Sequence, residues 1–244
     1  MNEENSTEII KSLREELKAS KSEIENFTHY ISHDFRAPLR HIMEFIQLLE
    51  IELADKLDEK SAKYLEIVSD SSLKLNSYVE ALLSYCRSGR EILTEISIDL
   101  NLLTAGLVEG FKKNVADRKI EWHVREMPIV KSDPTLLKQA FSILLENSIK
   151  FTKYKDIASV EIGFIKENQA ECVFYVADNG VGFSMSRADR LFNIFQKLHN
   201  EKFEGIGMGL AIFRRIIARL GGRVWATGEE NNGATFYFTL PLIK

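Results

Sequence analysis

Two different hydrophobic periods divide this chain into an N-terminal and a C-terminal half. Residues 8–88 contain no glycine and a single proline, and along residues 10–31 apolar side chains recur at alternating steps of three and four. This heptad spacing predicts an amphipathic helix with a seam that pairs with another helix. The seam positions are Ile10, Leu13, Leu17, Ser20, Ile24, Phe27 and Ile31.

After this first seam the pattern slips by four residues, which unwinds a supercoil locally, and Pro38 can kink the helix at the same place. A second apolar stripe follows a charged connection at residues 53–61. We therefore expect an antiparallel helical hairpin. Because two helices cannot bury both stripes well, two copies should form a dimeric four-helix bundle. The stripe positions are Phe35, Leu39, Ile42, Phe45 or Ile46, and Leu49, then Leu65, Val68, Ser72, Leu75, Val79, Leu82 and Cys86.

From residue 95 onward, short alternating runs interleave with helical ones. Asp133 followed by Pro134 is typical of a helix start, and Ser186 with Asp189 resembles a capping box. The pattern predicts an α/β sandwich, a mixed sheet under helices, whose last two strands pair antiparallel. We expect strands at 96–100, 120–124, 160–166, 171–177, 223–227 and 235–240, and helices at 102–113, 133–149, 191–198 and 209–220. The predicted domains are residues 1–90 and 91–244, with a linker near Gly89.

Composition narrows the class of protein. The net charge of −4 over 244 residues gives no electrostatic footprint for nucleic acid. No apolar run approaches the length that spans a bilayer, and the charged N-terminus lacks the core of a signal peptide. Cys86 and Cys172 lie far apart and are expected to be reduced. We therefore expect a cytoplasmic protein that is not inserted in a membrane.

One histidine has neighbours that suit chemistry. His33 lies off the apolar seam and is followed by Asp34. A neutral imidazole can attack phosphorus without first losing a proton, and a carboxylate can orient the ring by accepting its other N–H. Two other interpretations stay open at this point. His33 can be a solvated surface histidine, or it can share a zinc site with His29 and His41, although zinc needs further close ligands.

Polar residues suited to a nucleotide gather in the C-terminal half. Asn147 and Lys150 lie one turn apart on a predicted helix, an amide oxygen suiting Mg²⁺ and an ammonium suiting phosphate. Asp178 ends a predicted strand and can accept the amino group of adenine, while Gly180 and Gly182 allow close approach of the backbone. The alternatives are an exposed polar helix face and an ordinary Asp-Asn-Gly turn.

A third glycine-rich string opens the last predicted helix. Gly205, Gly207, Gly209 and Leu210 place unblocked N–H groups and a positive helix end where they can bind phosphates. No strand leads directly into this string, so it is not a Rossmann fingerprint, and the sequence has no P-loop motif.

These strings together resemble a known family. Residues 32–39, SHDFRAPL, resemble the H-box of sensor histidine kinases, and look closest to the phytochrome-type subgroup. Residues 145–151, 178–182 and 205–210 resemble the family's N, G1 and G2 boxes, and residues 191–199 its F-box. The resemblance implies a HisKA dimerisation domain followed by a HATPase_c domain of the gyrase, Hsp90 and histidine-kinase type.

The resemblance also implies roles for the residues. His33 would be autophosphorylated from ATP, Asp178 would hold adenine, Asn147 would hold Mg²⁺, and Lys150 and Lys197 would touch phosphates. Residues 196–204 would form a mobile ATP lid. The implied enzyme is a protein-histidine kinase of class EC 2.7.13.3. Its partners would be a second copy, the receiver domain of a response regulator in a two-component system, and an upstream sensor.

Two positions depart from the family's pattern. Ala37 stands where many members have the threonine or asparagine that supports dephosphorylation of the regulator, and Ile143 stands where many have a second asparagine. Two rival functions share the ATP fold. A hydrolytic ATPase of the gyrase kind needs a carboxylate at position 143, which isoleucine cannot supply. A catalytically inactive dimeric scaffold leaves the retention of His33, Asn147 and Asp178 unexplained.

Overall fold

A computed structural model describes residues 11–13, 15–16, 19, 34–53, 56–87, 93–166, 171–198 and 203–241. The chain divides into two compact units, Met1–Cys86 and Arg87–Lys244, which are described separately below. The predicted domain boundary at residue 90 falls among residues 88–92, outside the described part. No helix within the described ranges combines the length and the apolar character needed to cross a membrane.

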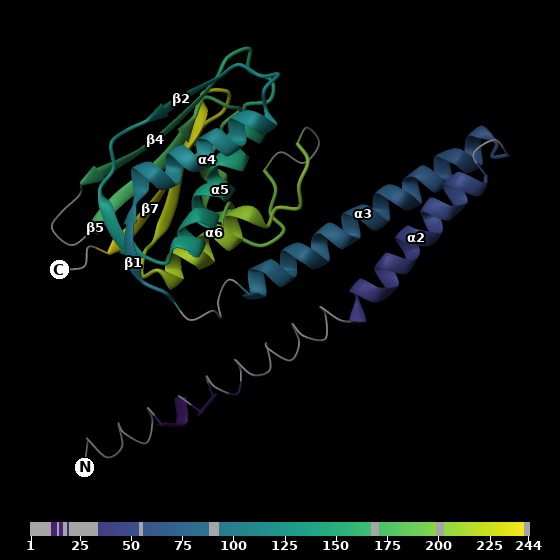
Figure 1. The fold of residues 1–244 in the computed structure, drawn as a ribbon, viewed down its shortest axis with the longest axis horizontal. Coiled ribbons are helices and arrows are strands. Elements are labelled where there is room, and N and C mark those ends of the chain that lie inside the picture. The colour runs from purple at the N-terminus through teal and green to yellow at the C-terminus, as the bar shows by residue number, and fades with distance from the viewer. Residues whose placement is uncertain are drawn as a thin grey trace. The chain divides into compact units, whose positions relative to one another are not determined.

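The N-terminal unit is the predicted helical hairpin, formed by α2 (Arg36–Glu52) and α3 (Glu59–Arg87) (Figure 1). Pro38 occupies the first turn of α2, where its missing N–H breaks no helical hydrogen bond. The side chain of Asp58 accepts a hydrogen bond from the Ser61 N–H at 2.7 Å and so caps the start of α3. A bidentate contact joins the two helices, because Arg36 donates to both carboxylate oxygens of Glu80 at 2.7 and 3.2 Å.

A single hairpin buries little of its apolar stripes. Leu39, Val79 and Leu83 form its buried cluster. Within one hairpin Leu83 is buried, whereas Leu82, the predicted stripe position of that turn, is half-buried. Leu83 lies four residues after Val79, on the face that meets α2. Large apolar side chains of both helices remain exposed. Of the first predicted seam only Leu13 lies within the described residues, and it is exposed. The exposed stripe residues are Phe35, Ile42, Phe45, Leu49, Val68 and Leu75.

The C-terminal unit is an α/β sandwich, as predicted (Figure 1). Five of its described strands form one sheet in the order β2-β4-β5-β7-β6, in which β2 and β4 pair in parallel and the other neighbours pair antiparallel. The strands are β2 (Ile120–Val124), β4 (Ala158–Lys166), β5 (Glu171–Asp178), β6 (Val224–Glu229) and β7 (Gly233–Pro241). One face is covered by α4 (Leu100–Asn114), α5 (Pro134–Phe151) and α6 (Gly209–Arg219). The predicted fold class, α plus α/β with a mixed sheet, is confirmed.

The core between the sheet and the helices is built on aromatic side chains. Phe238 of β7 packs edge-on against Phe141 of α5 and Phe213 of α6, with ring centroids 5.4 and 5.7 Å apart. The same ring stacks on Phe174 of β5 at 5.3 Å. All four side chains are fully buried, and contacts of this kind add to the gain from burial alone. This cluster fixes α5 and α6 over the middle of the sheet.

The start of α5 was predicted correctly. Asp133 accepts hydrogen bonds from the N–H groups of Thr135 and Leu136, each at 3.0 Å, and Pro134 is the first helical residue. The other carboxylate oxygen of Asp133 accepts from the Thr94 N–H at 3.0 Å. These bonds together hold the pKa of Asp133 below its usual value against the opposing effect of burial. They tie the start of α5 to the segment that enters the C-terminal unit.

Two predictions about this unit were wrong. The helix expected at residues 191–198 is absent; a 3-10 helix, η1 (Met185–Arg190), is followed there by turns. The Ser186 hydroxyl contacts that of Ser184 at 2.9 Å instead of capping a helix, and Phe195 has a positive φ of 59° that no α-helix accommodates. The sequence analysis also missed a short strand, β3 (Ile129–Ser132), which pairs antiparallel with β1 (Ile96–Asp99).

Candidate functional site

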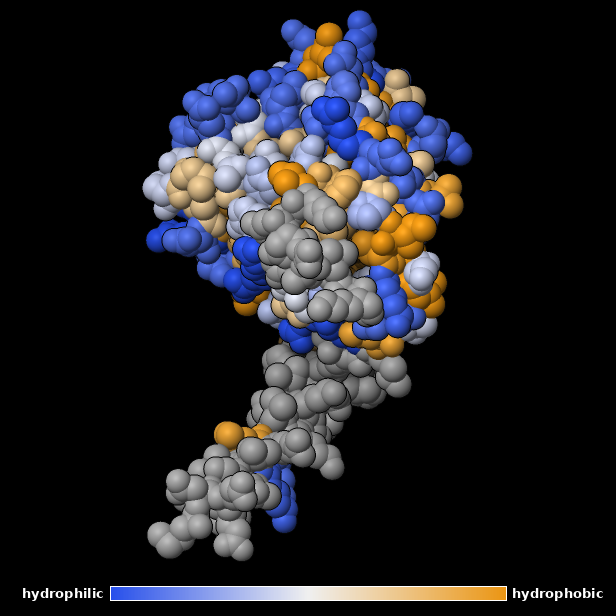
Figure 2. Space-filling model, turned by 90° about the vertical axis from the view of Figure 1, so that its left-hand side faces the viewer, coloured by the Kyte–Doolittle hydropathy of each residue, from blue (hydrophilic) through white to orange (hydrophobic). Residues whose placement is uncertain are grey.

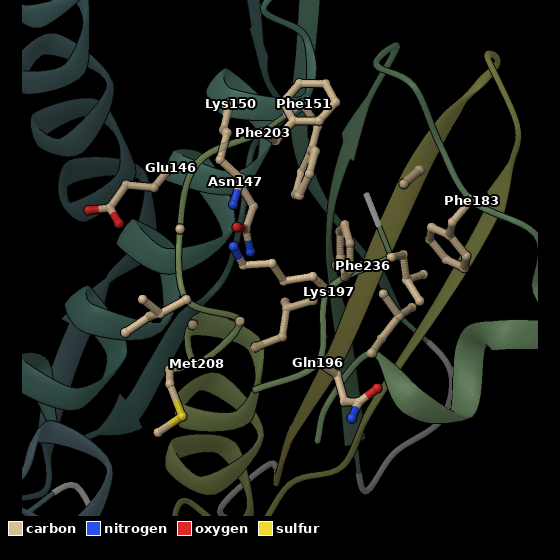
Figure 3. Close-up of a pocket in the computed structure, with 18 of the residues that line it drawn as sticks. Glu146, Asn147, Lys150, Phe151, Phe183, Gln196, Lys197, Phe203, Met208 and Phe236 are labelled. Atoms are coloured by element: carbon tan, nitrogen blue, oxygen red, sulfur yellow. The ribbon is translucent and has the colours of Figure 1, made fainter. Parts of the chain in front are cut away.

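A cavity of about 460 Å³ opens in the C-terminal unit between α5, the start of α6 and the ends of β5 and β7. Figure 3 shows the side chains around it. Nine of the ten residues that the sequence analysis assigned to a nucleotide line this cavity. They are Asn147, Lys150, Asp178, Gly182, Lys197, Gly205, Gly207, Gly209 and Leu210.

α5 supplies one unusual polar atom to the cavity. The Nδ2 atom of Asn147 is buried and has no hydrogen-bond partner among the described residues. An unsatisfied buried donor costs about 1–3 kcal/mol, which a ligand atom that accepts its hydrogen bond would recover. An amide in this state fits a polar ligand, and its oxygen is of the kind that Mg²⁺ prefers. Glu146, the preceding residue, also lines the cavity, but its carboxylate points away from Asn147 (Figure 3).

Two ammonium groups face the same space. Burial lowers the pKa of Lys150, the nearby charge of Lys197 lowers it further, and Glu146 opposes both. The Lys197 side chain extends toward Asn147 (Figure 3), and the Lys150 Nζ lies 4.4 Å from the centroid of the Phe151 ring. Two cations held together in a partly buried site favour an anionic ligand, because an anion relieves both their repulsion and their desolvation.

Asp178, the last residue of β5, also lines the cavity and lies beside Ser148 of α5. Its Oδ1 accepts the Gly180 N–H at 2.9 Å, and its Oδ2 accepts the Ser148 hydroxyl at 3.4 Å. Burial nevertheless raises the pKa of Asp178 to about 6, because these hydrogen bonds only partly replace lost solvation. Gly180 does not line the cavity. It supports Asp178, and a Cβ on it would come within 2.6 Å of the Phe151 carbonyl oxygen.

The last glycine string runs along the cavity before α6. Gly205 and Gly207 have positive φ values of 119° and 74°, a conformation that favours glycine. A Cβ on Gly207 would lie 2.5 Å from the carbonyl oxygen of Gln196, so the two backbones touch there. Met208, at the N-terminus of α6, makes no side-chain cap hydrogen bond. The first N–H groups of α6 therefore lack that cap and suit an anionic ligand.

The sequence analysis missed most of the apolar wall. Four aromatic rings and several aliphatic side chains line the cavity between its polar ends. Two of them had a local signal. Phe236 lies two residues before Phe238 on the same face of β7, and Phe183 directly follows the predicted Gly182. Most of the others lie inside the strings that resemble the N, F and G2 boxes or inside the expected lid, but no pattern within those strings marks them as lining residues. The missed lining residues are Glu146, Phe151, Phe183, Leu191, Gln196, Leu198, Phe203, Glu204, Ile206, Met208, Ala234 and Phe236.

The predicted nucleophile cannot be compared with this geometry. His33 lies outside the described residues, whereas Asp34 is helical and exposed. Of the three histidines in the zinc alternative, only His41 is described, and it is exposed on α2. In the part of the chain that the structure describes, no group of three or more His, Cys, Asp or Glu side chains could hold a metal.

Two family models match the chain in the order that the sequence predicted. Residues 23–91 match the His Kinase A (phospho-acceptor) domain, and residues 132–244 match the histidine kinase-, DNA gyrase B-, and HSP90-like ATPase family. The phytochrome-like protein Cph1 of Synechocystis sp. is 30% identical over 96% of this chain and 31% of its own length. The methanogenesis regulatory histidine kinase FilI of Methanothrix harundinacea is 32% identical over 93% of this chain and 25% of its own length. The chain thus spans about a third or less of these relatives.

Solved structures agree with these matches. Full-length ShkA in complex with AMPPNP superposes with a TM-score of 0.65 and 27% identity, covering 90% of this chain and 45% of that one. The histidine kinase ThkA in complex with the response regulator TrrA superposes with a TM-score of 0.63, covering 94% of this chain and 66% of that one. At 21% identity the second likeness concerns the fold alone. With both domains matched in order and the predicted pocket residues lining one cavity, the chain belongs to the sensor histidine kinases, and its phytochrome-like relatives fit the predicted subgroup.

Proposed function

We propose that this chain is a dimeric catalytic core that binds ATP with Mg²⁺, phosphorylates its own His33 and passes the phosphoryl group to an aspartate of a response regulator. The observation that carries the proposal is the convergence on one cavity of nine residues that the sequence predicts to bind a nucleotide. Their chemistry matches the parts of a nucleotide: a hydrogen-bond acceptor at Asp178, cations at Lys150 and Lys197, and glycine backbone before α6.

The nucleotide would lie with its base at Asp178 and its phosphates at the lysines. The carboxylate would accept the amino group of adenine, the rings of Phe183 and Phe236 would enclose the base, and the ammonium groups with the glycine N–H groups would bind the phosphates. Asn147 would hold Mg²⁺ through its amide oxygen, where the ion neutralises charge on the phosphates. The unpartnered Nδ2 of the same side chain would donate a hydrogen bond to a phosphate oxygen, so both ends of the amide suit the phosphate end of the nucleotide.

The transfer uses residues of the H-box. One nitrogen of the neutral His33 imidazole forms a bond to the γ-phosphorus, the bond from that phosphorus to the bridging oxygen breaks, and ADP leaves. Asp34 accepts a hydrogen bond from the N–H of the other ring nitrogen and so stabilises the positive charge that develops on the ring. The phosphoryl group then moves to an aspartate carboxylate of a receiver domain, forming an acyl phosphate and restoring the imidazole.

The hairpin supports a homodimer. Several stripe residues stay exposed in one copy, among them Phe45 at 66% and Ile42 at 45%. A second hairpin covers such a stripe in a four-helix bundle. The chain's N-terminal seam would receive its signal from an upstream sensor, and a cytoplasmic location suits the expected reduced cysteines.

Two rival functions fit less well. A water-activating carboxylate would have to stand at Ile143, whose side chain instead packs 3.4 Å from the Cβ position of Gly209. An inactive scaffold would not need a buried unpartnered amide beside two ammonium groups. These observations favour transfer to histidine over hydrolysis or a purely structural role.

Incubation with γ-labelled ATP tests the proposal. A phosphohistidine is acid-labile and alkali-stable, so label with that pattern is expected on the parent protein. His33→Ala should abolish the label while leaving ATP binding nearly intact, because nucleophile and pocket belong to separate units. Steady release of labelled phosphate without protein labelling would identify a hydrolytic ATPase, and neither product would identify a scaffold.

A further inference from the structure

Phe203 is buried although it lies in a segment without regular secondary structure, two residues before Gly205. Its side chain is 7% exposed and packs against two rings at the end of α5. The ring centroid lies 5.1 Å from that of Phe151 and 5.5 Å from that of Tyr154, both at an interplanar angle of 61°. Ring pairs at such distances and angles attract each other beyond their burial. The three rings of Phe151, Tyr154 and Phe203 are called the aromatic anchor below.

The aromatic anchor touches both walls of the cavity through Phe151. The Lys150 Nζ lies 4.4 Å from the centroid of the Phe151 ring, within the range of a cation–π contact. The Phe151 carbonyl oxygen accepts the Val181 N–H at 3.2 Å, in the segment that follows Asp178. Figure 3 shows Lys150, Phe151 and Phe203 close together, with Phe183 well away from them. A displacement of the anchor would therefore move Lys150.

The backbone that follows Phe203 lies directly against this lysine. A Cβ on Gly205 would be 3.3 Å from the Lys150 Nζ, and Gly205 adopts a φ of 119°. Two residues later, the backbone of Gly207 touches that of Gln196. Residues 203–207 are thus held at two points, by the aromatic anchor at one end and by Gln196 at the other.

We propose that Phe203 is a positioning residue that, through the aromatic anchor, holds Gly205 against Lys150 and so preforms the phosphate end of the cavity. The identity of the ligand rests on the proposed function, whereas the anchor itself does not. A preformed site spares a ligand the cost of ordering the loop when it binds. Loss of the Phe203 ring should therefore weaken ligands that carry phosphates and affect the base end little.

Nucleotide titrations of the full chain test this role. Phe203→Ala should weaken ATP binding about tenfold, the scale of two lost ring pairs, while adenosine, which lacks phosphates, changes by less than about twofold. Phe203→Tyr keeps the ring and should keep ATP affinity. Leu102→Ala, which removes an apolar side chain that is 73% exposed on α4, is the matched control and should leave both ligands unaffected. Equal losses for ATP and adenosine, or unchanged ATP affinity in Phe203→Ala, would overturn the inference.

Hydrogen exchange of the nucleotide-free protein separates this inference from the proposed function. In Phe203→Ala the amides of residues 205–209 should exchange about tenfold faster, while those of β5 and β7 keep the protection of the parent. If the parent chain binds no ATP, the proposed function fails and this measurement still tests the anchor. Unchanged exchange at residues 205–209 overturns the inference. Faster exchange in β5 and β7 as well would assign Phe203 to general stability and overturn it too.

Discussion

Replacing Asp178 by asparagine is expected to stabilise the nucleotide-free protein while weakening its binding of ATP. Burial raises the pKa of Asp178 from its ordinary 3.8 to about 6. Between these values the folded protein binds more protons at this site than the unfolded chain does. The free energy of unfolding therefore falls as the pH rises through this window, and the deficit persists above it. At 1.36 kcal/mol per pH unit, the rise in pKa corresponds to about 3 kcal/mol at neutral pH.

Asparagine has the same shape without the charge. Its oxygen can still accept the Gly180 N–H, and its amide can donate to the Ser148 hydroxyl. The variant therefore escapes the cost of a buried carboxylate. From the linkage relation, its stability relative to the parent should rise by about 1.4 kcal/mol between about pH 5 and about pH 8. This change with pH, rather than the absolute difference, isolates the titration of Asp178.

Urea unfolding followed by tryptophan fluorescence measures this difference, since Trp122 and Trp225 both lie in the C-terminal unit. Glu161→Gln is the matched control. The hydrogen bonds from Tyr175 and Arg125 lower the pKa of Glu161, so its contribution is fully present above its unfolded pKa and constant over this window. A difference for Asp178→Asn that stays as flat as the control would mean that Asp178 is already ionised below this window, and the reasoning would be wrong.

Four further outcomes are expected. By calorimetry, Asp178→Asn should weaken ATP binding by about 1.5–3 kcal/mol and erode the preference over GTP; unchanged affinity for both would place adenine elsewhere. Gly207→Ala forces a Cβ against the Gln196 backbone at a positive φ, so it should lower the thermal midpoint and ATP affinity together; a neutral result would contradict the tight contact. Phe45→Glu should convert the dimer to a monomer in sedimentation, whereas a dimer that persists would exclude this stripe from the interface. Finally, Ala37 lacks any group to hold a water, so the parent should be a poor phosphatase; Ala37→Thr should accelerate loss of label from the phosphorylated regulator by up to about 10²–10³, and no acceleration would refute this role.

Local signals predicted those parts of the fold that local chemistry decides. The side chain of Asp133 and the fixed φ of Pro134 mark the start of α5 whatever surrounds them, and that start was right. Residues 120–124 alternate clearly and form β2 within the predicted bounds. In β3 the buried positions are Val130 and Ser132 while Ile129 is exposed, so its apolar residues do not alternate and only its pairing with β1 reveals it.

Other predictions failed where a distant contact overrides a local preference. The capping box at Ser186 did not start an α-helix, because Ser186 lies inside η1, where its hydroxyl contacts that of Ser184, and the positive φ of Phe195 excludes an α-helix over the following residues. In the hairpin, heptad spacing alone could not separate the face that meets the other helix from the face left exposed. The choice of Leu83 over Leu82 therefore depends on how α2 and α3 cross. At the site, motif spacing predicted the polar residues correctly. It did not predict the apolar wall, because the members of that wall come from six different segments of the chain.

The polar groups of the cavity show that a sequence motif does not by itself determine how strongly its residues bind a ligand. Asp178 carries a raised pKa, Lys150 a lowered one, and the Asn147 amide lacks a partner among the described residues. Each state is unfavourable in the nucleotide-free protein, and each arises from burial that the sequence does not record. A ligand with a donor at one end and negative charge at the other relieves all three at once, because the donor bonds the carboxylate and the anion bonds the ammonium and amide groups. The same side chains on an exposed helix face would have ordinary pKa values and no preference for such a ligand. Selectivity for a nucleotide therefore follows from how deeply the fold buries these groups, to which the apolar wall and the aromatic anchor both contribute.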